Sequence, residues 1–377
     1  MSLNKAELAH YSRHILLSEI GKEGQEKLKN SKVLVIGAGG LGCPAAVYLG
    51  AAGVGTLGII DFDKVDISNL HRQFAFHQAD IGKYKAEVLK ERILANNPHI
   101  NIKVYKERFS IDNAQSLFDE YDVIVDGCDN FGTRYLSNDA SFFSGKPLVF
   151  GAIHKFQGQA SVFNLENGPC YRCLFPEPPD ANAIPNCAEA GVLGVLPGII
   201  GTIQATEAVK LIIGYGESLR GRFLVYDAMK MSFNEFKLTK NPACPLCGAN
   251  PEIKELKELQ VFCETQLSKA NKELEIEPEE LKELQEKPQE MMLIDIREEY
   301  EREICCIQGS EHIPLKMLAD VAKMLPKDKK IVLYCHKGTR SIEALKQLQE
   351  NGIKNILSLA GGIARWADEI EPEMGQY

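Results

Sequence analysis

The order of apolar and polar residues along the chain predicts strands and helices in alternation. Residues 5–30 are polar with apolar positions at helical spacing, which predicts amphipathic helix. The β-branched run at 32–36 predicts a buried strand, residues 44–52 a helix and residues 55–61 the next strand, and together these form a βαβ unit. Further strands are expected at 102–108, 122–126, 148–153 and 160–163. This alternation predicts an α/β fold with a mostly parallel sheet and helices on both faces.

A second, smaller α/β pattern occupies the end of the chain. Strands are expected at 292–296, 331–335 and 356–360, with a helix at 341–350. Between the two patterns, residues 251–290 are rich in Glu and Lys, which is typical of a linker and the entry to a new domain. We therefore expect a first domain at 1–250, a linker at 251–284 and a second domain at 285–377.

Two further segments of the first domain have distinct patterns. Residues 174–186 hold four prolines without periodicity, which predicts a mobile surface loop. Residues 194–211 are apolar nearly all round, which predicts a buried helix.

Composition and net charge argue against some classes of molecule as the main binding partner of the protein. The chain has 377 residues, of which 45% are hydrophobic, and its net charge is −9. That charge argues against nucleic acid or an anionic membrane as the main partner. The first twenty residues lack the apolar core of a signal peptide, and no apolar run approaches the roughly 20 residues that span a bilayer. We expect a cytoplasmic protein, in which eleven cysteines indicate metal binding or thiol chemistry rather than disulfides.

The strand at 32–36 leads into a glycine-rich loop, GAGGLG at 37–42. Such a loop before a helix binds phosphate groups on backbone N–H groups. By itself the loop favours a Rossmann-like dehydrogenase, in which Asp61 at the end of the next strand would contact a ribose. A nicotinamide-dependent oxidoreductase therefore remains an alternative.

Charged residues beyond Asp61 favour a nucleoside triphosphate. Asn69, Arg72 and Gln73 follow within a dozen residues, and Lys85 comes next. Cations of this kind balance the charge that develops as pyrophosphate leaves.

Two aspartates follow the strand at 122–126. Asp126 and Asp129 lie where ligands bind in open α/β sheets, and a carboxylate there can hold Mg²⁺ beside phosphates. Either residue taken alone could equally be a turn or helix-cap residue.

These separated motifs resemble the MoeB/ThiF family, the bacterial relatives of ubiquitin-activating enzymes. The resemblance rests on GAGGLG, on DFDKVDISNLHRQ at 61–73, on the Lys85 segment and on DGCDN at 126–130, and it covers about residues 5–248. It implies an ATP site with Gly39, Gly42, Asn69, Arg72 and Lys85 at the phosphates, Asp61 at the ribose and Asp129 holding Mg²⁺.

The resemblance also implies a homodimer. Arg13, in the segment YSRHILL, resembles the family arginine that enters the ATP site of the partner subunit. Without the resemblance, Arg13 would be interpreted as a solvated helix charge.

Four cysteines form two C-x-x-C pairs, Cys170 with Cys173 and Cys244 with Cys247. Two such pairs in turn-rich segments are a strong indication of Zn²⁺, and four thiolates with no open position indicate a structural site. A redox pair is the alternative, which the presence of two pairs disfavours. The family resemblance agrees with structural zinc.

Cys187 follows the proline-rich segment. A thiol beside a nucleotide site could reach an acyl-adenylate, and in the wider family a cysteine here can accept an acyl group or sulfur. The alternative is a small buried residue. The chain lacks the additional catalytic-cysteine and ubiquitin-fold domains of ubiquitin-activating enzymes, which disfavours ubiquitin-type relay.

The second domain contains a strand, a tight loop and a helix start in IVLYCHKGTRS at 331–341. Backbone N–H groups and the helix dipole there stabilise a thiolate, which makes Cys335 the candidate nucleophile. The charge of Lys337 adds to the positive electrostatic potential around the thiol. Arg340 would either hold the loop in place or bind the negative charge of the sulfur donor. The C-x4-R spacing gives a loop one residue shorter than the phosphatase loop, and it suits a persulfide sulfur.

The same region resembles a rhodanese over about residues 285–377, through LIDIREEYE, EHIPL, CHKGTR and GGIARW. It departs from the rhodanese pattern at 303–307, where Cys305 and Cys306 are expected to pack inside. Asp295 and Arg297 are expected to be structural.

Together the two resemblances imply an ATP- and Mg²⁺-dependent adenylyltransferase with sulfurtransferase activity. Its partner would be a small ubiquitin-like sulfur-carrier protein (MoaD/ThiS type) ending in Gly-Gly, and its sulfur donor a desulfurase or thiosulfate. The sequence leaves open whether the carrier serves molybdopterin, thiamine, cysteine or tRNA thiolation. Adenylation alone with a rhodanese docking module, and a zinc-tethered scaffold without catalysis, remain alternatives.

Overall fold

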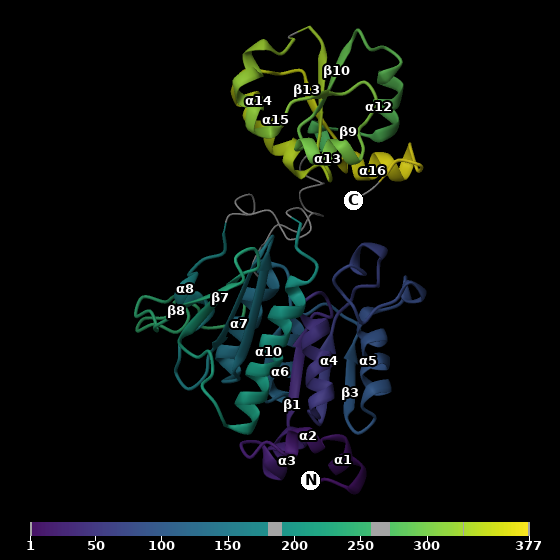
Figure 1. The fold of residues 1–377 in the computed structure, drawn as a ribbon. Coiled ribbons are helices and arrows are strands. Elements are labelled where there is room, and N and C mark those ends of the chain that lie inside the picture. The colour runs from purple at the N-terminus through teal and green to yellow at the C-terminus, as the bar shows by residue number, and fades with distance from the viewer. Residues whose placement is uncertain (1, 180–190, 258–271, 327, 376–377) are drawn as a thin grey trace. The chain divides into compact units, whose positions relative to one another are not determined.

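The structure is a computed structural model, which describes residues 2–179, 191–257, 272–326 and 328–375. The chain divides into two compact units, residues 1–261 and 262–377 (Figure 1).

The first unit contains an eight-stranded sheet in the order β3-β2-β1-β4-β5-β6-β7-β8. Its strands are β1 (Lys32–Ile36), β2 (Thr56–Ile60), β3 (Asn101–Tyr105), β4 (Val123–Asp126), β5 (Leu148–His154), β6 (Gln157–Phe163), β7 (Arg222–Asp227) and β8 (Ser232–Lys237). The first five pair in parallel, and β6, β7 and β8 are antiparallel additions at one side. The predicted α/β class and mostly parallel sheet are confirmed.

Helices cover both faces of this sheet. The helices are α1 (Lys5–His10), α2 (Ser12–Ile15), α3 (Gly21–Asn30), α4 (Gly42–Ala52), α5 (Lys85–Asn96), α6 (Ile111–Glu120), α7 (Phe131–Ser144), α8 (Tyr171–Leu174) and α10 (Leu196–Ile213). Figure 1 shows α10, α4 and α5 side by side along one face. The single helix expected over 5–30 is instead three helices, because the chain turns before α3 and Gly21 has a positive φ of 56°.

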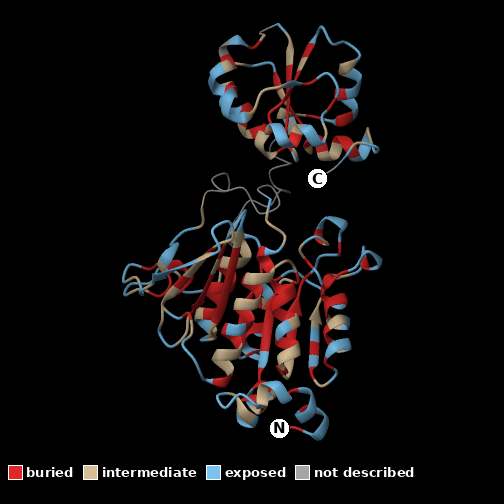
Figure 2. Cartoon of the chain, viewed as in Figure 1, coloured by how far each residue is buried: buried red, intermediate tan, exposed pale blue. Residues whose placement is uncertain are grey.

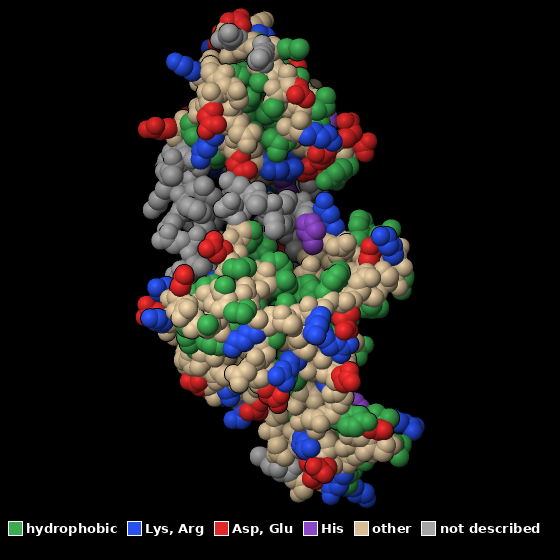
Figure 3. Space-filling view, turned by 90° about the vertical axis from the view of Figure 1, so that its left-hand side faces the viewer, with side chains coloured by type: hydrophobic (Ala, Val, Ile, Leu, Met, Phe, Trp, Pro, Cys, Tyr) green, Lys and Arg blue, Asp and Glu red, His purple; other side chains and the backbone are tan. Residues whose placement is uncertain are grey.

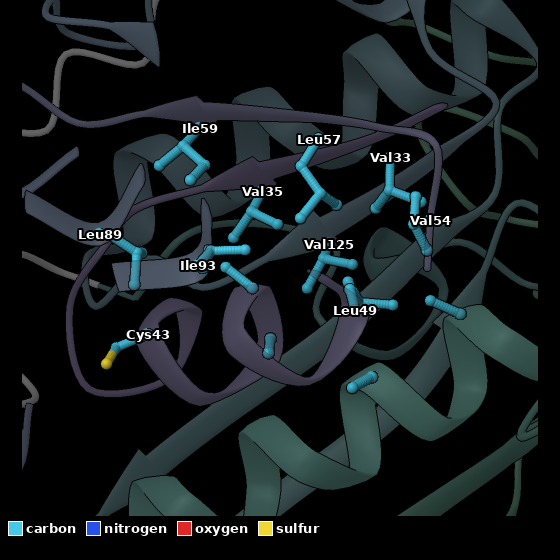
Figure 4. Close-up of a cluster of buried hydrophobic side chains, with 14 of the residues drawn as sticks. Val33, Val35, Cys43, Leu49, Val54, Leu57, Ile59, Leu89, Ile93 and Val125 are labelled. Carbon is cyan, nitrogen blue, oxygen red and sulfur yellow. The ribbon is translucent and has the colours of Figure 1, made fainter. Parts of the chain in front are cut away.

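Alternate residues of the central strands supply the two halves of the core. Val33 and Val35 of β1 pack with α4 and α5 on one face, while Leu34 and Ile36 pack with α6 and α7 on the other. Figure 4 shows the first of these clusters, with Leu49 of α4 facing the strand side chains. Figure 2 shows that the central strands β1, β2, β4 and β5 are buried along most of their length, as expected for a parallel sheet covered on both faces.

Among the described helices, α10 is the one that is long and apolar enough to cross a membrane. Half of its residues are buried, and it packs on α4, β5 and β6. These contacts are those of a core helix of the first unit.

The second unit is built on a five-stranded parallel sheet in the order β11-β10-β12-β13-β9. Its strands are β9 (Glu275–Ile276), β10 (Met291–Asp295), β11 (Glu311–His312), β12 (Lys330–Tyr334) and β13 (Ile356–Leu359). Its helices are α12 (Pro278–Gln285), α13 (Glu299–Ile304), α14 (Leu315–Val321), α15 (Thr339–Glu350) and α16 (Gly362–Glu369).

The beginning of the second unit differs from the predicted linker at 251–284. β9 pairs with β13 and α12 packs on α16, so residues 275–284 belong to the second unit. The helical turn and two-residue strand that open this unit are too short to show a hydrophobic period.

The surface of the first unit carries an apolar patch beside its last hairpin. Phe156, Met229, Met231 and Phe233 are each between 47% and 75% exposed. We call these four residues the hairpin patch. The backbone N–H of Ala228 donates to the carbonyl of Phe156, which joins the β5–β6 turn to the β7–β8 turn. Figure 3 shows hydrophobic side chains on this side of the unit among charges of both signs.

Candidate active site

A cavity of about 300 Å³ lies at the carboxyl ends of β1, β2 and β4. Six of the residues predicted for the ATP site line it, namely Gly39, Asp61, Asn69, Arg72, Lys85 and Asp129. The topology brings them together because parallel strands end at one edge of the sheet.

The glycine loop forms the floor of this cavity. Gly37 has a φ of 88°, a conformation that favours glycine. A Cβ at Gly42 would lie 1.8 Å from the carbonyl oxygen of Gly37, so the start of α4 can approach the loop only with glycine there. Gly42 does not line the cavity itself; it allows the close approach that sets the loop.

Asp61 fixes the loop from β2. One carboxylate oxygen accepts the backbone N–H of Ala38 at 2.6 Å, and the other accepts that of Asp63 at 2.7 Å. Burial raises the pKa of Asp61, and the hydrogen bond from Ala38 and the charge of Lys85 oppose that effect. Two oxygens offer about four acceptor sites, so the carboxylate can also accept hydroxyl groups of a ribose.

Lys85 and Arg72, the cations predicted to bind the phosphates, each have a polar partner nearby. The Nζ atom of Lys85 lies 3.0 Å from a carboxylate oxygen of Asp63. A guanidinium nitrogen of Arg72 lies 2.8 Å from the carbonyl oxygen of Ser68 and 2.8 Å from Nε2 of His71. Both cations are thus held beside the glycine loop.

The two aspartates after β4 have different environments. Asp126 is fully buried and accepts the N–H of Cys128 at 3.0 Å, and burial raises its pKa. Asp129 is exposed and lines the cavity. Asn130 caps α7 through the N–H of Thr133. Asp126 is therefore the turn residue, and Asp129 is the carboxylate available to a cation.

The cavity also contains residues that the sequence did not single out. Phe62 and Arg108 stack with 4.4 Å between the guanidinium carbon and the ring centroid, and the guanidinium of Arg134 lies over the ring of Phe150. Arg108 lies three residues beyond the end of β3, and Asp61 directly follows β2. Because ligands bind at the carboxyl ends of parallel strands, this position could have indicated Arg108 from the sequence.

Arg13 does not line this cavity. It is exposed on α2, in a groove with Tyr48 and Ala52 near the end of α4 and with Thr206 of α10. The glycine loop meets the opposite end of α4, which at about 1.5 Å per residue is about 15 Å away.

The four predicted metal-ligand cysteines meet in space. Their sulfur atoms all lie within 4.8 Å of one another. The Sγ atoms of Cys170 and Cys244 are 3.5 Å apart, and those of Cys173 and Cys247 are 3.3 Å apart. A tetrahedral Zn²⁺ with Zn–S bonds of about 2.3 Å separates its sulfur ligands by about 3.8 Å. The cluster fits a four-thiolate metal site.

Cys187 lies outside the described residues. The described chain resumes at Gly191, and Val192 pairs with Lys155 and lines the cavity.

The candidate nucleophile of the second unit lies in a tight loop. Cys335 is 1% exposed, and its Sγ accepts the backbone N–H of Gly338 at 3.2 Å where α15 begins. The backbone N–H groups of Ile363 and Ala364, at the start of α16, donate to the carbonyls of Cys335 and His336. Gly362 must be small, because a Cβ there would lie 2.5 Å from the carbonyl oxygen of Cys335.

Arg340 holds this loop to the rest of the unit. Its guanidinium forms two hydrogen bonds with the Glu301 carboxylate, at 2.9 and 2.6 Å. Of its two expected roles, this contact supports holding the loop.

The other residues predicted for the second unit differ in how far their side chains are buried. Asp295 and Arg297 form a fully buried ion pair, as expected for structural residues. Cys305 is half-buried, whereas Cys306 is exposed, so the expectation that Cys306 packs inside is wrong. Cys306 lies beyond the end of α13, between the half-buried Cys305 and the buried Ile307.

Comparison with known proteins agrees with this architecture. Residues 11–246 match the ThiF family, and residues 277–369 match the rhodanese-like domain. A probable adenylyltransferase/sulfurtransferase MoeZ of Mycobacterium tuberculosis is 44% identical over all of this chain and 97% of its own.

Two further relatives and one solved structure extend the comparison. The sulfur carrier protein adenylyltransferase of Thermus thermophilus is 48% identical over 70% of this chain and 99% of its own. The adenylyltransferase and sulfurtransferase MOCS3 of Aedes aegypti is 38% identical over all of this chain and 90% of its own. A crystal structure of E. coli MccB with ATP has the same fold, with a TM-score of 0.57 and 24% identity over 65% of this chain and 75% of that one. The chain belongs to the ThiF family and carries a C-terminal rhodanese-like domain.

Proposed function

We propose that the protein adenylates the C-terminal carboxylate of a small sulfur-carrier protein and then transfers sulfur to it from Cys335. The observation that carries this proposal is the joint presence of two sites in one chain. One is a cavity with the glycine loop, Arg72, Lys85 and Asp129, and the other is the thiol loop around Cys335. Relatives that carry both activities in their names span nearly the whole chain.

The residues of the cavity divide the work of adenylation. The N–H groups of the glycine loop and the cations of Arg72 and Lys85 bind the phosphates, and Asp61 binds the ribose. Asp129 would supply an oxygen ligand to Mg²⁺, and the bound ion would neutralise charge on the phosphates. A carboxylate oxygen of the carrier forms a bond to the α-phosphorus while the bond to pyrophosphate breaks, so the products are acyl-adenylate and pyrophosphate.

The hairpin patch is the surface on which we place the carrier. Its Phe156 follows the Ile153–Lys155 segment, in which Ile153 lines the cavity and Lys155 pairs with Val192. A protein that inserts its C-terminal tail into the cavity must rest its folded part beside the entrance. Exposed Met and Phe side chains there offer an apolar contact surface.

Sulfur transfer to the carrier follows in three steps. The Cys335 thiolate takes the outer sulfur of a donor persulfide and releases the donor thiolate; with thiosulfate, sulfite leaves instead. The new persulfide attacks the acyl-adenylate carbonyl, AMP leaves, and an acyl disulfide joins the carrier to Cys335. A second thiol then attacks Sγ of Cys335, so that the thiocarboxylate leaves and a disulfide remains. Cys187 is our candidate for that thiol, and a dithiol reductant restores both cysteines.

Zinc and a second subunit complete the proposal. Zn²⁺ bound by Cys170, Cys173, Cys244 and Cys247 is structural, because four protein thiolates leave no open coordination position. Arg13 lies far along α4 from the cavity of its own chain, which supports its predicted action in the partner subunit of a homodimer.

The decisive experiment is carrier-dependent ATP–pyrophosphate exchange with a panel of carriers ending in Gly-Gly. One carrier should support exchange, and Asp129→Ala should abolish it. Asp112→Ala, an exposed carboxylate outside the cavity, is the matched control. Absence of exchange with every carrier, despite ATP binding, would overturn the adenylation step.

The sulfur step has its own outcome in the same assay. Cys335→Ser should retain exchange but yield no thiocarboxylate, as read from the mass of the carrier. Full thiocarboxylate yield with Cys335→Ser would instead support adenylation alone, with the rhodanese-like domain as a docking module.

A further inference from the structure

Two buried serine hydroxyls lead from the core of the second unit to the sulfur of Cys335. Ser358 of β13 and Ser341 of α15 are both fully buried. The Oγ atom of Ser358 donates to that of Ser341 at 2.8 Å, and Ser341 Oγ lies 3.5 Å from Sγ of Cys335. A buried hydroxyl is costly unless it is hydrogen-bonded, so this pair is a specific arrangement.

The hydroxyl proton of Ser341 can form a hydrogen bond with either of two acceptors. Its oxygen accepts the hydrogen bond from Ser358, so its own proton can face either Sγ of Cys335 or the carbonyl oxygen of Gly338, which is 3.0 Å away. A neutral thiol is a weak acceptor, and the carbonyl then takes the proton. A thiolate is charged and accepts hydrogen bonds more strongly, so ionisation of Cys335 draws the proton to sulfur.

Both a backbone N–H group and a side-chain hydroxyl thus lie beside the sulfur of Cys335. The N–H of Gly338 donates to the same sulfur at 3.2 Å, and the N-terminus of α15 lies beside it. Ser341 adds a donor whose direction depends on Ser358, and Ser358 itself forms no hydrogen bond with the sulfur in the described part of the chain.

We propose that Ser358 and Ser341 form a hydroxyl relay that orients Sγ of Cys335 and favours its thiolate. Ser341 touches the reacting sulfur, and Ser358 is a positioning residue that acts through Ser341. The inference rests on the proposed role of Cys335 as sulfur acceptor. In that step the stabilised thiolate forms a bond to the outer sulfur of the donor persulfide, whose own S–S bond breaks as the donor thiolate leaves.

The test is the pH profile of Cys335 alkylation by iodoacetamide in the full chain, followed by mass spectrometry of the Cys335 peptide. Ser341→Ala should raise the midpoint by about 1–2 pH units, since this is the shift to which the loss of a hydrogen bond to a charged group corresponds. Ser358→Ala should raise the midpoint by less. The double variant should match Ser341→Ala alone, because Ser358 acts only through Ser341.

Control variants separate this effect from loss of folding. Ser310→Ala removes another buried hydroxyl of the same unit, bonded to Tyr334, and should leave the midpoint unchanged. Ser341→Thr keeps the hydroxyl and should restore most of the wild-type profile. Emission of Trp366, the only tryptophan of the chain, reports whether the unit is folded.

Two results would overturn the relay. One is a Ser358→Ala midpoint equal to wild type, and the other is full additivity of the two alanine shifts. Failure of the proposed function looks different: Cys335 of the wild type would then gain no sulfur from thiosulfate or a desulfurase. The pH profile of Cys335 alkylation tests the hydroxyl relay whether or not Cys335 accepts sulfur.

Discussion

The carboxylate of Asp61 accepts the backbone N–H of Ala38 at 2.6 Å, so the residue expected to bind ribose also holds the glycine loop. Asp61→Asn keeps the shape but replaces one acceptor oxygen with an NH₂ donor. We expect at least a tenfold loss of ATP affinity, because a charge-assisted hydrogen bond is worth about 1.5–3 kcal/mol.

Isothermal titration calorimetry with ATP and Mg²⁺ measures this loss. Asp119→Asn, an exposed carboxylate on α6, is the control with unchanged affinity. Equal affinity for wild type and Asp61→Asn would show that the carboxylate serves neither ribose nor loop.

The hairpin patch predicts a variant that affects the carrier but not the nucleotide. Phe233→Ser should raise the KM for the carrier about tenfold, since burying a phenylalanine contributes about 1.5–3 kcal/mol. The ATP Kd should stay constant. Tyr215→Ser removes an aromatic ring of similar exposure outside the patch and is the matched control. A KM equal for the two variants would place the carrier elsewhere.

The ion pair of Arg340 with Glu301 should set the activity of the thiol loop. Arg340→Ala leaves the Glu301 side chain, which is only 6% exposed, without its main cation. We expect sulfur loading of Cys335 to fall at least tenfold and the second unit to lose about 1–3 kcal/mol of stability.

Urea unfolding followed by Trp366 fluorescence measures that stability loss. Lys316→Ala, which breaks an exposed ion pair with Glu298, should change neither quantity. Pyrophosphate exchange by Arg340→Ala should match wild type, and a parallel loss of exchange would contradict a role confined to the thiol loop.

The first unit should show an acid-sensitive contribution from Asp80. Burial alone would raise the pKa of Asp80, but hydrogen bonds from Lys83, from the N–H of His77 and from Arg92 outweigh it and lower the pKa to about 2. A depressed pKa stabilises the folded state above the unfolded value of 3.8, and that contribution disappears as the pH falls toward 2.

Asp80→Asn should therefore destabilise the protein at pH 7, and its deficit should shrink between about pH 4 and pH 2. Circular dichroism in urea at pH 7, 4 and 3 follows this change, with Trp366 fluorescence identifying the signal of the second unit. A deficit that is constant with pH would contradict an ionised Asp80 as its source.

The four-cysteine cluster predicts one tightly bound zinc per chain. Cys244→Ser should remove the metal, as measured by elemental analysis, and lower the thermal stability of the first unit. Cys306→Ser, at an exposed thiol, should keep both. Full metal content in Cys244→Ser would exclude this cluster as the site.

The sequence predicts β1–β6 of the first sheet and β10, β12 and β13 of the second, because each is a short run rich in apolar or β-branched residues, such as 32–36 and 331–335. It does not predict β7 and β8, whose residues are mostly exposed or half-buried, or the two-residue strands β9 and β11. It also brings Asp61 and Asp129 to one place, since both follow parallel strands. It does not predict Glu301 as the partner of Arg340, or Ser358 as the partner of Ser341, because 39 and 17 residues separate these pairs. Such contacts depend on how helices pack on the sheet, and that packing leaves no local pattern in the chain.

The four-cysteine cluster joins two parts of the first unit that lie far apart in the sequence. Cys170 and Cys173 lie at α8, and Cys244 and Cys247 follow β8. The Sγ atoms of Cys173 and Cys247 are nevertheless 3.3 Å apart. A metal ion held there would close a chain loop that contains α10, β7 and β8, so its removal should loosen the antiparallel side of the sheet first.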